Sequence, residues 1–195
     1  MCCGNSPFFG CRFSLYPMTD SFVPVILDAV QEVRRPGIVV ETDDISTCLV
    51  GVEPNVFAAL RDCLARACKS GEHVVLSATF SKGCPGEGTV NLEDFAFPAD
   101  TDFTTKDGCE QEVACQFSIY PLGNLDYMKL IYDVVDITKK LGVYAGSSHF
   151  CTRLEGTIED VFKALEASFE HTTKQTGHSV MVATLSCNSP TKKQG

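Results

Sequence analysis

Two threonines on predicted strands, Thr47 and Thr152, are the first candidates for contact with a small molecule. Strand alternation places Thr47 in the same row as Ile45, and this row is expected to face the helices. Thr152 has the same relation to Phe150. An unpaired buried polar group costs about 1–3 kcal/mol, so each hydroxyl needs a hydrogen-bond partner. That partner is either a nearby backbone carbonyl or a ligand, and the recurrence of threonine favours a pocket lining.

A second set of hydroxyls lies on two other predicted strands, on the face opposite the helices. This set consists of Ser14, Tyr16, Ser118 and Tyr120. Hydroxyls donate and accept hydrogen bonds without carrying charge, which suits a heteroaromatic ring or a second sheet docked through ordered water. A solvated face built from good strand formers is the alternative interpretation.

The turn that precedes Thr47 differs in sequence from the turn that precedes Thr152. One turn contains Asp43 and Asp44, whereas the other ends in His149. Asp44 and its neighbour could attract a cation or accept a hydrogen bond from an amino group, although paired turn carboxylates are commonly solvated. His149 could stack on a ring or donate to it, or it could be a surface residue without a function.

Enzymatic and metal sites are not indicated. The chain has no P-loop, no GxGxxG, no HExxH and no GxSxG. It has 11 cysteines, an odd number, and no CxxC pair of the kind that a structural zinc site needs. We therefore expect no metal and no cofactor, and reduced cysteines that pack as small apolar side chains. Four histidines accompany these thiols, so a cysteine-dependent enzyme remains an alternative.

Composition restricts the class of partner. The 195 residues carry a formal net charge of −9, and lysine and arginine do not form a long cluster. Binding to nucleic acid or to an anionic membrane depends on accumulated positive charge, so neither is expected, and a cationic small molecule fits better. No apolar run approaches the roughly 20 residues of a membrane-spanning helix. The first residues lack the features of a secretory signal, which predicts a cytoplasmic protein.

The chain is a tandem duplication. Cys11–Pro17 aligns with Cys115–Pro121, at an offset of about one hundred residues. After one inserted residue the alignment continues without a gap, from Ile26 on Ile131 to Pro85 on Pro190. Each helix and strand can therefore be predicted from two sequences, which reduces the ambiguity of a prediction from one.

Each copy predicts the element order βαββαβ. In the first copy the pattern indicates a strand at 11–16, a helix at 20–34, a hairpin from residue 38, a helix from Pro54 and a strand at 73–81. This order is a ferredoxin-like α+β unit, with an antiparallel sheet and helices on one face. We expect a first unit at 9–83, a linker at 84–112, a second unit at 113–190 and a tail at 191–195.

Several separate motifs resemble the YkoF-type thiamin/hydroxymethylpyrimidine-binding family along nearly the whole chain. They are Arg12–Asp20, Thr42–Thr47, Thr79–Gly86, Cys115–Pro121, Asp126–Ile131 and Leu185–Pro190. The resemblance implies tandem ferredoxin-like units that assemble as a homodimer and bind thiamin or its hydroxymethylpyrimidine moiety without catalysing a reaction. One pocket per repeat would serve carriage, storage or sensing.

The resemblance also points to site residues. It implicates the motif Ile45–Thr47, including Ser46 and Thr47, and its counterpart Phe150–Thr152. It further implicates the hydroxyls of Ser14, Tyr16, Ser118 and Tyr120. The competing hypothesis is a regulatory or assembly module that binds another small molecule such as an amino acid, because the fold alone does not determine the ligand.

Overall fold

The computed structural model describes residues 9–83 and 108–191, except for the side chain of Ser148. The first copy consists of β1 (Phe9–Pro17), α1 (Phe22–Ala29), the 3₁₀ helix η1 (Val30–Val33), β2 (Ile38–Thr42), β3 (Thr47–Gly51), α2 (Glu53–Cys68) and β4 (Val74–Lys82). The second consists of β5 (Glu112–Leu122), α3 (Tyr127–Lys140), β6 (Tyr144–Ser148), β7 (Cys151–Thr157), α4 (Ile158–Thr173) and β8 (His178–Cys187). The predicted α+β fold of two βαββαβ copies is confirmed.

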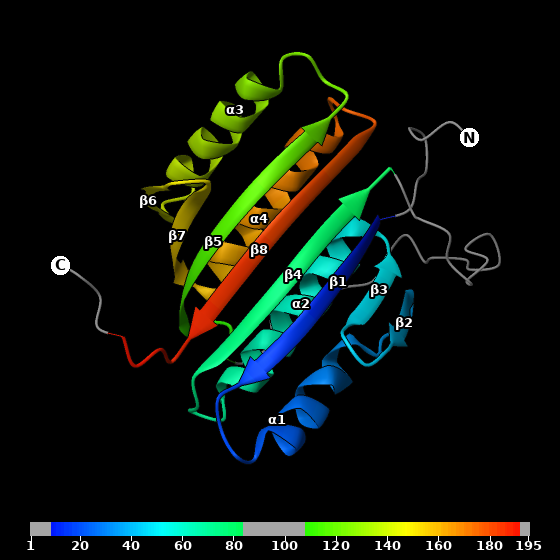
Figure 1. Cartoon of the computed structure of the whole chain (residues 1–195), viewed down its shortest axis with the longest axis vertical. Helices are drawn as coiled ribbons and strands as arrows, with labels where there is room; N and C mark the ends of the chain where they lie inside the picture. Colours follow the sequence, from blue (N-terminus) through cyan, green and yellow to red (C-terminus); the bar gives the residue numbers. More distant parts are fainter. Residues whose placement is uncertain (1–8, 84–107, 192–195) are drawn as a thin grey trace.

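The two copies share one sheet. Its eight strands have the order β2-β3-β1-β4-β8-β5-β7-β6 (Figure 1). The last strands of the copies, β4 and β8, pair antiparallel in the centre, with Ala78 opposite Ala183. The two predicted four-stranded sheets are therefore joined edge to edge, and pairing removes two strand edges that would otherwise be exposed.

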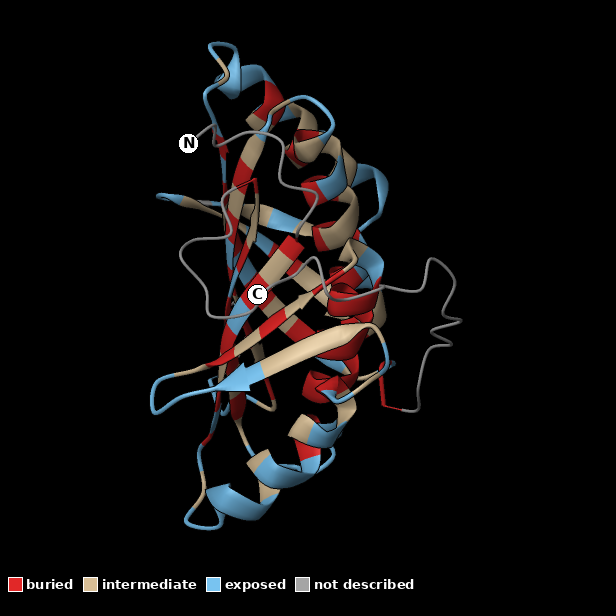
Figure 2. Cartoon of the chain, turned by 90° about the vertical axis from the view of Figure 1, so that its right-hand side faces the viewer, coloured by how far each residue is buried: buried red, intermediate tan, exposed pale blue. Residues whose placement is uncertain are grey.

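In the described part of the chain, all four α-helices lie on one face of this sheet and none of them covers the opposite face, which is called the open face below (Figure 2). Burial alternates along β1: Phe13 and Leu15 are buried beneath the helices, whereas Arg12 and Tyr16 are exposed on the other side. The alternation predicted from the sequence is thus present in the structure, and it places Ser14 on the open face.

Local sequence signals set the helix boundaries. The Thr157 hydroxyl accepts a hydrogen bond from the Asp160 amide and thereby caps the start of α4. Pro54 lies in the first turn of α2, where its missing N–H is harmless. The helix predicted at 20–34 is shorter, because α1 ends at Ala29 and a 3₁₀ turn follows. Gly37, with φ of 78°, then allows the chain to enter β2.

The hydrophobic core crosses from one copy to the other. The rings of Phe57 and Phe80 are stacked with centroids 4.6 Å apart, and Phe9 stacks on Phe57 at 5.4 Å. Phe169 of α4 meets Phe9 edge-on at 5.2 Å. Such offset and edge-to-face pairs add to the energy of burial, so the aromatic cluster helps to hold the two copies together.

A buried ion-pair network accompanies this core. Asp62 on α2 accepts from Arg35 at 2.5 Å and from Arg61 at 2.9 Å, and its side chain is only 1% exposed. Arg61 also reaches Glu159 on α4 at 3.0 Å. Buried charges need this degree of pairing, because their desolvation is costly. The network therefore fixes how α2 lies against α4.

Most of the predicted linker, residues 84–107, lies outside the described residues, as do residues 1–8 and 192–195. The described end of the linker packs against α4. Cys109 is fully buried, and its carbonyl accepts from the Glu159 amide at 3.0 Å. Among the described residues, no helix combines the length and the apolar character needed to cross a membrane.

The expectation that the cysteines are reduced is wrong for one pair. Cys68, at the end of α2, forms a disulfide with Cys187, at the end of β8. The two residues are 119 positions apart, and only the pairing of β4 with β8 brings them together. The duplication places Lys82 and Thr173 at the equivalent corner, so the molecule has a covalent link at one corner only.

We expect this disulfide to stabilise the fold. The double variant Cys68→Ala/Cys187→Ala should lose about 2–5 kcal/mol of unfolding free energy, because the link restricts the unfolded chain over a long loop. Urea unfolding with and without dithiothreitol measures this loss. The reductant should lower the stability of the wild-type protein toward that of the variant and leave the variant unchanged. Equal stability of the two proteins without reductant would contradict the expectation.

Candidate functional site

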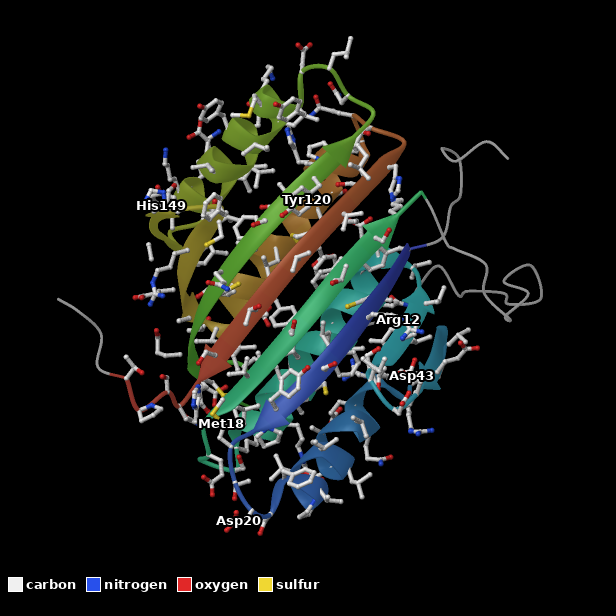
Figure 3. The ribbon with its side chains drawn as sticks, in the orientation of Figure 1. Arg12, Met18, Asp20, Asp43, Tyr120 and His149 are labelled. Carbon is white, nitrogen blue, oxygen red and sulfur yellow. A yellow bond between two sulfur atoms is a disulfide. The ribbon has the colours of Figure 1, made fainter. Side chains whose placement is uncertain are left out.

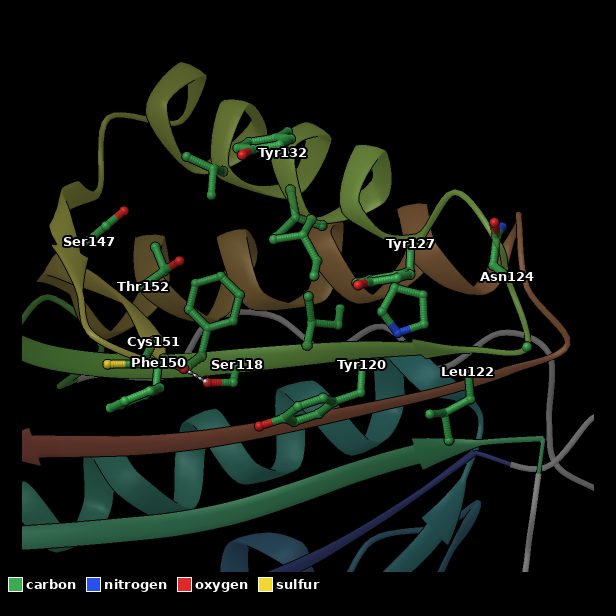
Figure 4. A pocket seen from close by; sticks show the side chains of 17 residues that line it. Ser118, Tyr120, Leu122, Asn124, Tyr127, Tyr132, Ser147, Phe150, Cys151 and Thr152 are labelled. Atoms are coloured by element: carbon green, nitrogen blue, oxygen red, sulfur yellow. Dashed lines mark hydrogen bonds between the residues drawn. The ribbon is translucent and has the colours of Figure 1, made fainter.

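The candidate site lies beside β5, along the part of this strand that extends past the start of its antiparallel neighbour β7. β5 pairs with β7 from Glu112 to Phe117, whereas Ser118–Leu122 pair within the described residues only with β8 on the other side. Backbone donors and acceptors along this strand edge are therefore available to a ligand. A cavity of about 650 Å³ lies here, between the strand edge, α3 and the β6–β7 turn (Figure 4).

Aromatic rings and hydroxyls make up much of the lining of this cavity. Figure 4 shows Tyr127 and Tyr132 on α3, across the cavity from Ser118 and Tyr120 on β5. Ser147, Phe150, Cys151 and Thr152 line the end formed by the hairpin, and Asn124 lies at the opposite end. Tyrosine faces attract cations, and hydroxyls bind ring nitrogens and amino groups. The cavity is thus suited to a cationic heteroaromatic molecule.

Ser14 and Ser118 make equivalent contacts in the two copies. The Ser118 hydroxyl donates to the Phe150 carbonyl at 2.7 Å, and the Ser14 hydroxyl donates to the Ile45 carbonyl at 3.0 Å. Each serine therefore holds the hairpin turn against the first strand of its copy. The oxygen of each hydroxyl can still accept a hydrogen bond from a ligand.

The two threonines differ in exposure. Thr47 is only 8% exposed, and its hydroxyl lies 3.1 Å from the hydroxyl of Thr42. Thr152 is half-buried and lines the cavity. Both lie at or next to the start of a strand, β3 or β7, so the structure places them beside the turns as the sequence predicted.

The prediction that Ile45 and Phe150 face the helices is wrong. Ile45 is 80% exposed and Phe150 is 98% exposed. Strand alternation does not extend to them, because β3 begins at Thr47 and β7 begins at Cys151. Both residues lie in the hairpin turn instead, where their side chains point into solvent.

Four further predicted site residues are exposed, whereas Ser46 is half-buried. Tyr16 and Tyr120 are about half exposed on the open face, at 53% and 50%. Asp44 and His149 are exposed in the turns, and the His149 ring lies 6.0 Å from the ring of Phe150. His149 does not line the cavity described above.

In the first copy, Asp43 rather than Asp44 organises the turn. The Asp43 carboxylate accepts from the Ile45 and Ser46 amides at 2.9 and 2.8 Å, and from Arg12 at 2.8 Å. These donors hold the pKa of Asp43 at about 2, with the Arg12 hydrogen bond as the largest cause. Arg12 also donates to the Ser46 hydroxyl at 2.8 Å. Figure 3 shows Arg12 and Asp43 together in this copy, well apart from Tyr120 and His149 of the other.

Sequence reasoning missed Tyr127, Tyr132 and the Arg12–Asp43 pair as site residues. The alignment of the copies places Tyr127 on Phe22, so an aromatic residue at both positions was a usable signal for the cavity wall. The ion pair had no such signal. Gln116 and Ser148 replace its two members in the second copy.

The thiols give little support to a cysteine nucleophile. Burial raises the pKa of Cys63 to about 12 and that of Cys109 to about 11, and it also raises the pKa of Cys11 and Cys115. A thiol of this kind is protonated at neutral pH, whereas the nucleophile is the thiolate. Over the described residues, no group of three histidine, cysteine or acidic side chains is placed to hold a metal.

A second hollow, of about 490 Å³, lies between α2 and α4, at the corner equivalent to the disulfide. Lys82 reaches Glu53 there at 3.1 Å, and Lys174 pairs with Glu170 at 2.7 Å. Burial, followed by the charges of Glu53 and Glu170, raises the pKa of Glu166 to about 7. Both signs of charge line this hollow and largely neutralise one another, so it is a weaker candidate site than the aromatic cavity.

A family model and a curated relative both match most of this chain. The model described as "YKOF-related Family" matches residues 8–87 and 112–192, one segment for each copy. A relative from Bacillus subtilis (strain 168), named "Putative HMP/thiamine-binding protein YkoF", is 40% identical over 193 residues, which cover 98% of this chain and 96% of that protein.

A solved structure of aspartate kinase from Clostridium acetobutylicum is 10% identical. The match covers 86% of this chain and 33% of the kinase chain, with a TM-score of 0.22. A likeness this low carries no argument about fold or function.

The raised pKa of Glu166 predicts a pH-dependent stability. The folded state holds its proton up to about pH 7. The unfolded chain releases it near pH 4.5, so this group lowers stability as the pH rises from about 4.5 to 7. Glu166→Gln should therefore stabilise the protein at pH 8 and have little effect at pH 4.5. Thermal unfolding at both pH values checks this, with the exposed Glu72→Gln as a control. A gain for Glu166→Gln that does not change with pH would contradict the assignment.

Proposed function

This chain belongs to the YKOF-related family, and on that premise we propose that it binds thiamin or its hydroxymethylpyrimidine moiety, in one pocket per repeat. The name of the Bacillus subtilis relative refers to these two ligands. Binding without catalysis would serve carriage, storage or sensing of the vitamin or its precursor.

The cavity beside β5 is the observation that carries this proposal. An aminopyrimidine presents donors and acceptors in the plane of its ring, and these match an open strand edge together with the hydroxyls of Ser118 and Thr152. The thiazolium ring of thiamin is a cation, and the faces of Tyr127 and Tyr132 attract cations. The net charge of −9 adds a long-range attraction for a positively charged ligand. The volume also lies within the ordinary range for ligand pockets, which is about 300–1,000 Å³.

We assign the other predicted residues to the same two pockets. Tyr120 flanks the second pocket on the open face, and His149 stands on the turn beside it. In the first pocket, the corresponding contacts come from five residues: Ser14, Tyr16, Asp44, Ser46 and Thr47. The raised pKa values of the buried thiols support a binding protein over a cysteine-dependent enzyme. A cytoplasmic location stays a prediction.

A titration with thiamin and with hydroxymethylpyrimidine tests the function. Calorimetry should show saturable binding to the full chain. Tyr127→Leu should weaken binding at one of the two sites by about 0.5–2 kcal/mol, because it removes a ring face from the cationic ligand. Phe22→Leu is the matched variant in the first copy and should act on the other site. Absence of heat with both ligands, together with stabilisation by an amino acid, would favour the regulatory-module alternative.

We further propose that a second copy of the chain covers the open face of the sheet. The central part of that face carries small uncharged side chains, for example Val75, Ser77, Val182 and Thr184. Residues at the centre of an interface are characteristically poor in charge. A twofold axis would place this face against its own copy, as in most homodimers.

Light scattering after gel filtration tests the dimer. The mass should be twice the 21.2 kDa of the chain. Val182→Asp should give monomers, because it buries a charge between the two sheets. Leu141→Asp is a matched control, since Leu141 is also 37% exposed but follows α3 on the helix side. A monomeric wild-type protein, or a dimer insensitive to Val182→Asp, would refute the arrangement.

A further inference from the structure

The turn that bounds the second pocket carries an unusual residue, Phe150. Its ring is 98% exposed although it is among the side chains that line the cavity. Its φ of 72° lies in the left-handed region, which an aromatic residue rarely adopts. Burial of the Phe150 ring would remove apolar surface from water. A change of the Phe150 backbone out of the left-handed region would relieve an unfavourable conformation.

Two contacts of the described side chains join this turn to β5, one strong and one weak. The Phe150 carbonyl accepts from Ser118 at 2.7 Å, and the Cys151 thiol lies 4.0 Å from the side-chain oxygen of Gln116. A thiol is a weak donor, so the second contact contributes little. β6, which leads into the turn, contains a register shift between Tyr144 and Gly146. A bulge of this kind bends a strand and interrupts its pairing.

The equivalent turn of the first copy is held much more firmly. Asp43 accepts from the Ile45 and Ser46 amides, and Arg12 bridges Asp43 and the Ser46 hydroxyl. Ile45, which stands where Phe150 stands in the other copy, has no left-handed backbone. These contacts of Arg12, Asp43 and Ser46 are called the lock below. In the second copy the three residues are replaced by Gln116, Ser148 and Cys151.

From this contrast we propose that Phe150 is the cover of the second pocket. The turn at 149–151 closes when a ligand occupies the cavity, and the Phe150 ring then stacks on the heteroaromatic ring between α3 and β5. The first pocket has no such closure, because the Arg12–Asp43 lock holds its turn. This inference rests on the proposed function and names the residue that makes the two pockets unequal.

Ligand binding provides the driving force for closure. Stacking against a bound ring removes apolar surface of Phe150 from water, and aromatic pairs gain further from their offset geometry. A ligand shifts a conformational equilibrium only through contacts that differ between the two states. Phe150 makes such a contact in the closed state alone, so ligand binding and closure are coupled.

The absence of tryptophan from the chain makes a direct test possible. Phe150→Trp and Ile45→Trp each introduce one fluorophore, at equivalent positions of the two turns. On titration with thiamin, the emission of the tryptophan at 150 should change and saturate together with the calorimetric signal, whereas that of the tryptophan at 45 should stay constant. Phe150→Ala should weaken the second site about tenfold, in line with the loss of a stacked and buried ring.

A lock-removal variant gives the complementary test. Arg12→Gln/Asp43→Ser, introduced together with Ile45→Trp, should make the tryptophan at 45 respond to ligand. Binding that is weakened by Tyr127→Leu, combined with a silent tryptophan at 150 and full affinity of Phe150→Ala, would overturn the cover while leaving the function intact. Absence of binding to the wild-type chain would refute both.

Discussion

The pairing of β4 with β8 is the interaction on which the rest of the architecture depends. It converts two four-stranded units into one sheet and aligns α2 beside α4. The aromatic cluster of Phe9 and Phe169 and the ion pair of Arg61 with Glu159 both cross from one copy to the other. Neither contact could form if the last strands of the copies did not meet. The centre of the molecule therefore depends on contacts that both copies make.

The cavity beside β5 follows from a mismatch in strand length that both copies share. β1 and β5 extend beyond the hairpin strands with which they pair, because β3 and β7 begin only at Thr47 and Cys151. An exposed strand edge is a liability in a soluble domain, since it can pair with another chain. In the second copy α3 and the hairpin turn enclose this edge and convert it into a cavity. The cavity is thus bounded by a strand edge that elements of the same unit shelter.

The fold could be predicted from the sequence because each helix and strand pattern occurs twice in the chain. Two aligned copies distinguished strands from helices and assigned the inner and outer faces of β1, where Phe13 is buried and Tyr16 is exposed. The site was predictable only in part. Alternation was extended too far, so Ile45 and Phe150 were expected beneath the helices although they lie in turns. The sequence also did not distinguish Asp43 from Asp44. Only the folded turn shows that Asp43 is the carboxylate that accepts from the backbone amides of Ile45 and Ser46. The Cys68–Cys187 bond needed the central pairing, which joins segments far apart in the chain.

The two unlike corners of the molecule have an evolutionary consequence. In an assembly of two identical chains, every substitution appears twice, so a symmetric pair of corners must change together. Covalent fusion of the two units removes that restriction. One corner carries the disulfide of Cys68 with Cys187, whereas the other carries Lys82 paired with Glu53. Because both units lie on one chain, a residue of one unit can be substituted without the same change in the other.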